Sequence, residues 1–97
     1  MTTVGTKRAP YTPEPNDFYV GRPGKWGNPF VTGKHAKTRE ECVELFRVWI
    51  TTGDGRHLLQ DLHELRGKRL ICWCHPRACH ADVLAELTNM LYPDDTL

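Results

Sequence analysis

The strongest constraint on the fold is the apolar stretch at residues 68–74, Lys-Arg-Leu-Ile-Cys-Trp-Cys. Its continuous run of apolar residues, bounded by Gly67 on one side and Pro76 on the other, is typical of a strand that is buried on both faces of a sheet. Such a strand lies in the middle of its sheet, so the rest of the chain must supply neighbouring strands and the helices that cover them.

Two shorter strands and three helices can be identified around this central strand. The expected elements are a first edge-like strand from Val4 to Arg8, a second strand over residues 17–21, and helices over residues 38–53, 56–67 and 79–91. The first helix carries the clearest signal, because Thr38 and Glu41 form a capping-box pattern ahead of an apolar helical face. The order β, β, α, α, β, α, with a long crossover before the third strand, favours one small α/β domain with a short, partly parallel three-stranded sheet.

The second strand runs directly into an irregular segment at residues 21–37, which contains four glycines and two prolines. Long segments without secondary structure are uncommon inside compact domains, and those that occur are often functional. A Pro-rich segment at residues 9–16 is expected to be an extended linker. We therefore treat the whole chain, residues 1–97, as one domain with a linker at 9–16 and a functional loop at 21–37.

The composition excludes several classes of protein. The chain is 26% charged and its mean hydropathy is negative, so we expect no membrane span. The N-terminus lacks the features of a signal peptide, which predicts a cytoplasmic protein whose four cysteines are not paired in disulfides. Lys and Arg outnumber acidic residues in the first 40 residues, and the reverse holds afterwards, so an anionic ligand is expected near the first half.

Candidate chemistry is concentrated in residues 72–82, Cys-Trp-Cys-His-Pro-Arg-Ala-Cys-His-Ala-Asp. Alternate strand residues share a face, which places Cys72 and Cys74 on the same side. Cys79 and His80 begin the final helix, whose free N–H groups and dipole would stabilise an anion or a Cys79 thiolate. Cys72, Cys74, Cys79 and His80 are also the residue types that bind zinc. The C-x-C-x4-C-H spacing argues against zinc, since adjacent Cys79 and His80 should leave a helix in different directions.

If the second and third strands are parallel, their carboxyl ends lie at the same edge of the sheet, where ligands bind in open α/β folds. Residues 21–30 and 75–82 would then form two walls of one pocket. Cations would hold phosphate, an aromatic ring would stack on a base, and amide, imidazole and carboxylate groups would bind polar edges. The predicted ligand-binding residues are Arg22, Lys25, Trp26, Asn28, Arg77, His80 and Asp82.

Purely structural roles explain some of these residues equally well. Trp26 can fix the loop to the sheet, and Asn28 can bind backbone groups ahead of Pro29. His80 and Asp82 can stabilise the start of the last helix. Cysteines in apolar segments are often small buried residues, as expected for Cys42 and Cys72, and both Trp49 and Trp73 are expected in the core.

Two motifs of the chain resemble those of a small protein family. The first is Tyr-Val-Gly-Arg-Pro-Gly-Lys-Trp-Gly-Asn-Pro-Phe at residues 19–30. The second is Leu-Arg-Gly-Lys-Arg-Leu-Ile-Cys-Trp-Cys-His-Pro-Arg-Ala-Cys-His-Ala-Asp-Val-Leu at residues 65–84. This family is the domain of unknown function 4326, common in bacteriophage and bacterial genomes. The resemblance covers most of the chain and implies a phage-type protein acting in the host cytoplasm. It brings no established activity, so it points to site residues and not to a reaction.

The sequence is compatible with three functions. The first is binding of a nucleotide or a nucleotide-derived phosphorylated ligand, with no cofactor. The second is an enzyme acting on a nucleoside or nucleotide, with Cys79 as nucleophile and His80 or Asp82 as acid or base. The third is a zinc-stabilised module that binds a host protein or a nucleic acid. The exposed edges of so small a sheet would also allow a homodimer.

Overall fold

The computed structural model describes residues 1–8, 10–74 and 77–93. Its elements, in chain order, are β1 (Thr3–Thr6), β2 (Asp17–Tyr19), α1 (Arg39–Thr52), the 3₁₀ helix η1 (Arg56–Leu65), β3 (Arg69–Cys72) and α2 (His80–Leu91). This order confirms the predicted α/β class and the predicted sequence of elements. None of the helices in the described part of the chain has the length and apolar character needed to span a lipid bilayer.

The sheet has the strand order β1-β3-β2, and β3 is parallel to both neighbours. The sheet is therefore parallel in both described pairs and not only in part. Leu70 and Ile71 of β3 are almost completely buried, as expected for a central strand. The strand ends at Cys72, two residues earlier than the apolar pattern predicts.

Helix α1 begins as the sequence predicts. The Thr38 side chain accepts a hydrogen bond from the Glu41 backbone, and the Glu41 side chain accepts one from the Thr38 backbone, so both halves of the capping box are present. Gly53 ends the helix, and its N–H group donates to the carbonyl groups of Val48 and Trp49. The second predicted helix is also present, but as the 3₁₀ helix η1, which ends just before Gly67 with its φ of +73°.

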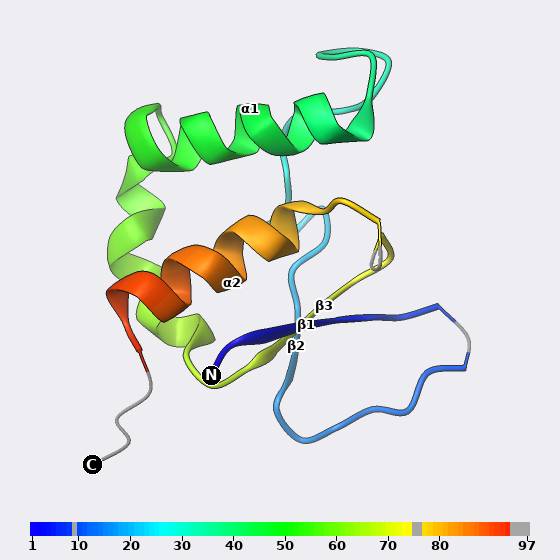
Figure 1. Cartoon of the computed structure of the whole chain (residues 1–97), viewed down its shortest axis with the longest axis vertical. Helices are drawn as coiled ribbons and strands as arrows, with labels where there is room; N and C mark the ends of the chain where they lie inside the picture. The colour runs from blue at the N-terminus through cyan, green and yellow to red at the C-terminus, as the bar shows by residue number, and fades with distance from the viewer. Residues whose placement is uncertain (9, 75–76, 94–97) are drawn as a thin grey trace.

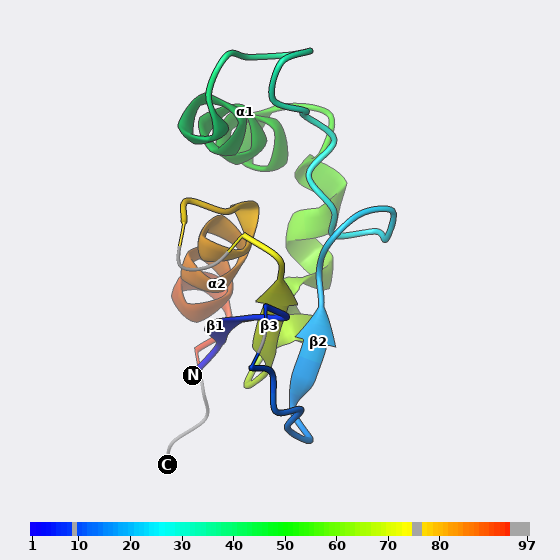
Figure 2. The same ribbon diagram turned by 90° about the vertical axis from the view of Figure 1, so that its right-hand side faces the viewer.

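The helices build the core on the sheet (Figures 1 and 2). Helix α2 packs against β1 and β3, and α1 and η1 both pack against α2. The fully buried side chains come from α1, η1, β3 and α2 and include Phe46, Ile50, Leu62, Leu65, Leu70 and Leu84. The core lies between the helices and the sheet. The pocket described below is formed at the ends of β2 and β3 and by the loops that follow them.

The second strand is held in register by a half-buried ion pair at its start. Arg69 binds the Asp17 carboxylate with both Nε and Nη2, at 2.6 and 2.9 Å, across the β2–β3 pair. Tyr11 Oη donates to the same carboxylate at 2.7 Å, and Arg69 also donates to the Thr12 carbonyl. These contacts tie the described part of the predicted Pro-rich linker, residues 10–16, to the sheet; Ala9 lies outside the described residues.

Candidate functional site

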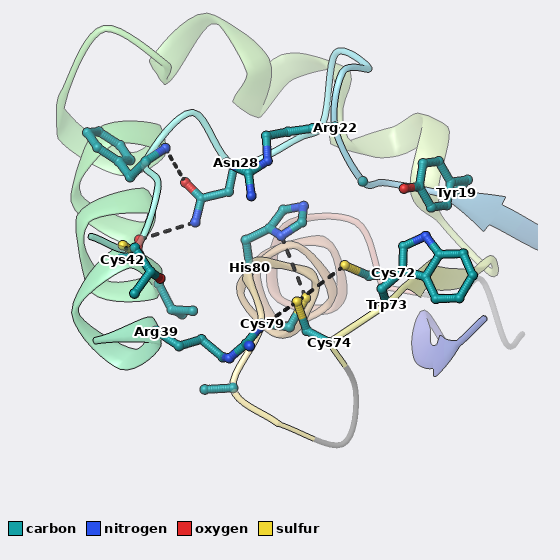
Figure 3. Close-up of a pocket in the computed structure, with 15 residues that line it drawn as sticks. Tyr19, Arg22, Asn28, Arg39, Cys42, Cys72, Trp73, Cys74, Cys79 and His80 are labelled. Carbon is teal, nitrogen blue, oxygen red and sulfur yellow. Dashed lines mark hydrogen bonds between the residues drawn. The ribbon is translucent and has the colours of Figure 1, made fainter. Parts of the chain in front are cut away.

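A pocket of about 250 Å³ opens at the carboxyl ends of β2 and β3 (Figure 3). This is the edge of a parallel sheet at which ligands bind in open α/β folds. Its lining comes from the end of β2 and the loop after it, the start of α1, the end of β3, and the start of α2. The lining residues are Tyr19, Gly21, Arg22, Asn28, Phe30, Thr32, Arg39, Cys42, Val43, Cys72, Trp73, Cys74, Ala78, Cys79 and His80.

The two sequence motifs meet directly in this pocket. His80 Nε2 donates a hydrogen bond to the Val20 carbonyl at 2.7 Å, which joins the start of α2 to the end of β2. The Val20 N–H group in turn donates to the Ile71 carbonyl of β3. Arg22, Asn28 and His80 all line the pocket, so three of the predicted ligand-binding residues lie together.

Two other predicted residues of the loop lie away from the pocket. The Lys25 ammonium forms ion pairs with Asp61 and Glu64 on η1, at 2.9 and 3.2 Å. The Trp26 side chain is only 3% exposed and belongs to the hydrophobic core. This burial corrects the expectation that Trp26 faces a ligand, because a buried indole has no free face on which a base can stack. The structural alternative, in which Trp26 fixes the loop, fits its position.

The amide of Asn28 also has a structural role in this arrangement. Its Oδ1 accepts from the Phe30 N–H group at 2.9 Å, and its Nδ2 donates to the Cys42 carbonyl at 3.3 Å. These bonds join the loop to α1 and shape the wall of the pocket, as the dashed lines in Figure 3 show. Asn28 therefore holds the loop in place while lining the pocket.

The second motif is only partly inside the pocket. Arg77 and Asp82 are exposed, and neither is among the residues that line it. Asp82 lies in the first turn of α2, where its carboxylate complements the helix dipole. The neighbouring His75 and Pro76 lie outside the described residues. Asp82 therefore lies outside the pocket that Cys79 and His80 line.

The pocket lining includes residues that the sequence did not predict as ligand-binding, among them Tyr19, Trp73 and Arg39. Tyr19, the last residue of β2, is 41% exposed, and Trp73, the residue after β3, is 54% exposed. The expectation that Trp73 lies in the core is therefore wrong, since β3 has ended and the side chain no longer faces a helix. Arg39 reaches the pocket from the start of α1, where its Nη1 donates to Cys74 Sγ at 2.9 Å.

The sequence held weak signals for Tyr19 and Trp73 but none for Arg39. Tyr19 and Trp73 each lie at the carboxyl end of a predicted strand, and such ends line the binding edge of a parallel sheet. Arg39 lies in the first turn of α1. Its contact with Cys74 depends entirely on how the helix packs in the tertiary structure. Its role could not be read from local pattern.

Three cysteines and a histidine converge at the floor of the pocket (Figure 3). The Sγ atoms of Cys72 and Cys74 are 3.8 Å apart, which confirms that these residues point the same way. Cys79 Sγ and His80 Nδ1 are 3.6 Å apart, so the argument that adjacent residues must diverge is wrong. The ligand atoms of Cys72, Cys79 and His80 all lie within 4.8 Å of one another.

The pKa values of the three cysteines and the histidine in this cluster are shifted in different directions. The hydrogen bond with Cys79 lowers the pKa of Cys72 to about 5, and the same interaction raises the pKa of Cys79. Burial raises the pKa of Cys74 and lowers the pKa of His80, so His80 is neutral at pH 7. The hydrogen bond between Cys72 and Cys79 therefore makes one thiol of the cluster easier to ionise than an ordinary cysteine.

Comparison with known proteins places the chain in a family. The family described as domain of unknown function (DUF4326) matches residues 4–90. The uncharacterized 12.4 kDa protein in the nrdA-td intergenic region of Enterobacteria phage T4 is 38% identical over an alignment of 81 residues, which covers 81% of this chain and 73% of that protein. No solved structure matches the chain. Since the family match spans nearly the whole chain and both motifs, the chain belongs to the DUF4326 family.

Proposed function

We propose that this phage-type protein binds a small phosphorylated ligand, a nucleotide or a nucleotide derivative, in the pocket at the ends of β2 and β3. One observation carries the proposal: the pocket combines two arginine side chains with two exposed aromatic rings at the binding edge of a parallel sheet. Phosphate and a base are the ligand groups that this combination suits. The protein would act in the host cytoplasm, where its thiols remain reduced.

The phosphate would bind between Arg22 and Arg39. Arg22 is exposed at the start of the loop, and Arg39 is half-buried at the start of α1. A guanidinium group has five N–H donors in a planar fork that matches two phosphate oxygens. One N–H group of Arg39 donates to Cys74, which fixes the side chain at the pocket. The other N–H groups of the guanidinium would bind the phosphate.

The base or sugar would lie against Tyr19 and Trp73. Figure 3 shows both rings on the same side of the cysteine cluster, opposite Arg39. Base stacking on an aromatic side chain contributes about 1–3 kcal/mol and does not depend on base identity. The pocket, about 250 Å³, lies just below the range of about 300–1,000 Å³ that holds drug-sized ligands. This size favours a pentose phosphate or a nucleoside monophosphate over a dinucleotide.

Titration calorimetry with a panel of nucleoside phosphates, ribose 5-phosphate and unphosphorylated nucleosides tests the proposal. Replacement of Arg22 or Arg39 by alanine removes a charge-assisted hydrogen bond of about 1.5–3 kcal/mol, so affinity for phosphorylated ligands should fall about 10- to 100-fold. Arg77→Ala is the matched control, because Arg77 is an exposed cation outside the pocket lining. Mass spectrometry should recover the bound ligand unchanged.

The panel also defines what would overturn the proposal. Failure of every phosphorylated compound to bind would exclude this ligand class. Equal affinity in the Arg22→Ala, Arg39→Ala and Arg77→Ala variants would exclude this pocket. Turnover of a bound ligand would replace binding by catalysis as the function.

A further inference from the structure

The cysteine cluster has a second property, which is independent of the proposed phosphorylated ligand. Its four side chains come from the end of β3 and the start of α2, and Cys72, Cys79 and His80 are buried. Thiolates and imidazole are the ligands of structural zinc sites, which are usually tetrahedral with four protein ligands. We propose that Cys72, Cys74, Cys79 and His80 bind one zinc ion.

The distances in the cluster match the edges of a zinc tetrahedron. With Zn–S bonds of about 2.3 Å and Zn–N bonds of about 2.05 Å, two sulfur ligands lie about 3.8 Å apart, and a sulfur and a nitrogen ligand about 3.6 Å apart. Cys72 Sγ and Cys74 Sγ are separated by 3.8 Å, and Cys79 Sγ and His80 Nδ1 by 3.6 Å. Two edges therefore already have the required length.

The orientation of His80 supports the same assignment. A carbonyl oxygen can only accept, so the bond of 2.7 Å to Val20 requires the proton on Nε2. Nδ1 is then unprotonated and directs its lone pair toward Cys79. Zinc-binding histidines commonly donate their other N–H group to a backbone carbonyl in this manner, which fixes the tautomer and the ring.

The backbone at the start of α2 explains how adjacent residues can bind one ion. Cys79 is the N-cap, with an extended conformation of φ −149° and ψ 147°, and only His80 has entered the helix. The Cys79 side chain therefore turns back over the first turn, where the Ala81 N–H group donates to its Sγ at 3.5 Å. The helical geometry assumed for both residues in the sequence argument does not apply.

The charges around the cluster also suit a bound zinc ion. Three thiolates, a neutral imidazole and Zn²⁺ carry a net charge of about −1. The Arg39 guanidinium lies against this group and donates to Cys74 Sγ at 2.9 Å. A cation in this position would balance the excess charge, and its hydrogen bond would orient the most exposed of the three cysteines.

Metal analysis of purified protein, prepared with added zinc and then dialysed, tests this inference. We expect about one zinc per chain, and replacement by Co²⁺ should give the thiolate charge-transfer band and the intense d–d bands of tetrahedral cobalt. Cys72→Ser and Cys79→Ser should lose the metal. Cys42→Ser is the matched control, because Cys42 is also buried and lines the same pocket but is not part of the cluster.

If a serine variant fails to fold, the zinc content and the cobalt spectrum of the wild-type protein still test the inference. Wild-type protein without stoichiometric zinc and without a tetrahedral cobalt spectrum would overturn the inference. So would zinc retained by both Cys72→Ser and Cys79→Ser, or zinc lost equally from Cys42→Ser. Ligand binding is measured separately by calorimetry, so a protein that holds zinc but no nucleotide, or the reverse, refutes one proposal and not the other.

Discussion

The two tryptophans of the motifs should respond in opposite ways to replacement by alanine. Trp26 is 3% exposed in the core, whereas Trp73 is 54% exposed at the pocket. Truncation of a core tryptophan costs about 3–5 kcal/mol because it leaves a cavity, and an exposed substitution usually changes stability by less than about 0.5 kcal/mol. A domain of this size has a total stability of about 5–15 kcal/mol, so the loss at Trp26 is a large part of it.

Urea unfolding followed by far-ultraviolet circular dichroism measures the difference without relying on tryptophan fluorescence. With a slope of about 1–3 kcal/mol per molar urea, Trp26→Ala should lower the unfolding midpoint by more than about 1 M, and Trp73→Ala by less than about 0.5 M. Ligand affinity should show the reverse order. Trp73→Ala should weaken the binding of a stacked base about 5- to 100-fold, and the milder core variant Trp26→Phe should bind normally.

Two results would refute this reasoning. Equal loss of stability in Trp26→Ala and Trp73→Ala would mean that Trp26 does not fill the core. Normal base binding by a folded Trp73→Ala variant would mean that Trp73 does not contact the ligand.

Two further predictions concern contacts that stabilise the fold away from the pocket. The Arg69 guanidinium holds the pKa of the Asp17 carboxyl well below its usual value of 3.8, so the stabilisation from this pair is present above that value and is lost as pH falls below it. Asp17→Asn should therefore be less stable than wild type at pH 7 in urea titrations, with a gap that closes below about pH 4; a gap that does not change with pH would contradict the assignment. Thr38→Ala should cost about 0.5–2 kcal/mol in the same assay by removing the cap of α1, whereas Thr38→Ser should retain most of that stability.

The elements of the fold could be predicted because their signals are local. The capping box at Thr38, the apolar face of α1 and the continuous apolar run in β3 each depend on residues close in the chain. The parallel pairing of β2 and β3 followed from the long crossover between them. These features needed no knowledge of tertiary contacts, and the structure confirms them.

The side chains of the site were harder to assign, because their positions depend on how loops fold back. Trp26 and Trp73 are the same residue type, and each lies in a segment that follows a strand. Only the packing of the loop, with Lys25 held against η1, shows that Trp26 is the buried one. The wrong expectation that Cys79 and His80 point apart had a more specific cause. The last helix was predicted to begin at Cys79, whereas Cys79 is the N-cap and the helix begins at His80.

The bond between His80 and Val20 explains why the two motifs act as one structural unit. Val20 is the residue at which β2 gives way to the loop, and its carbonyl group points to the imidazole instead of to a neighbouring strand. This single contact sets the His80 tautomer that directs Nδ1 toward the cysteines, and it also fixes the position from which the chain continues to Arg22. The orientation of the cysteine cluster and the placement of Arg22 at the pocket therefore depend on the same hydrogen bond. Because it is buried, the bond could not be lost without leaving both a carbonyl and an imidazole nitrogen unsatisfied.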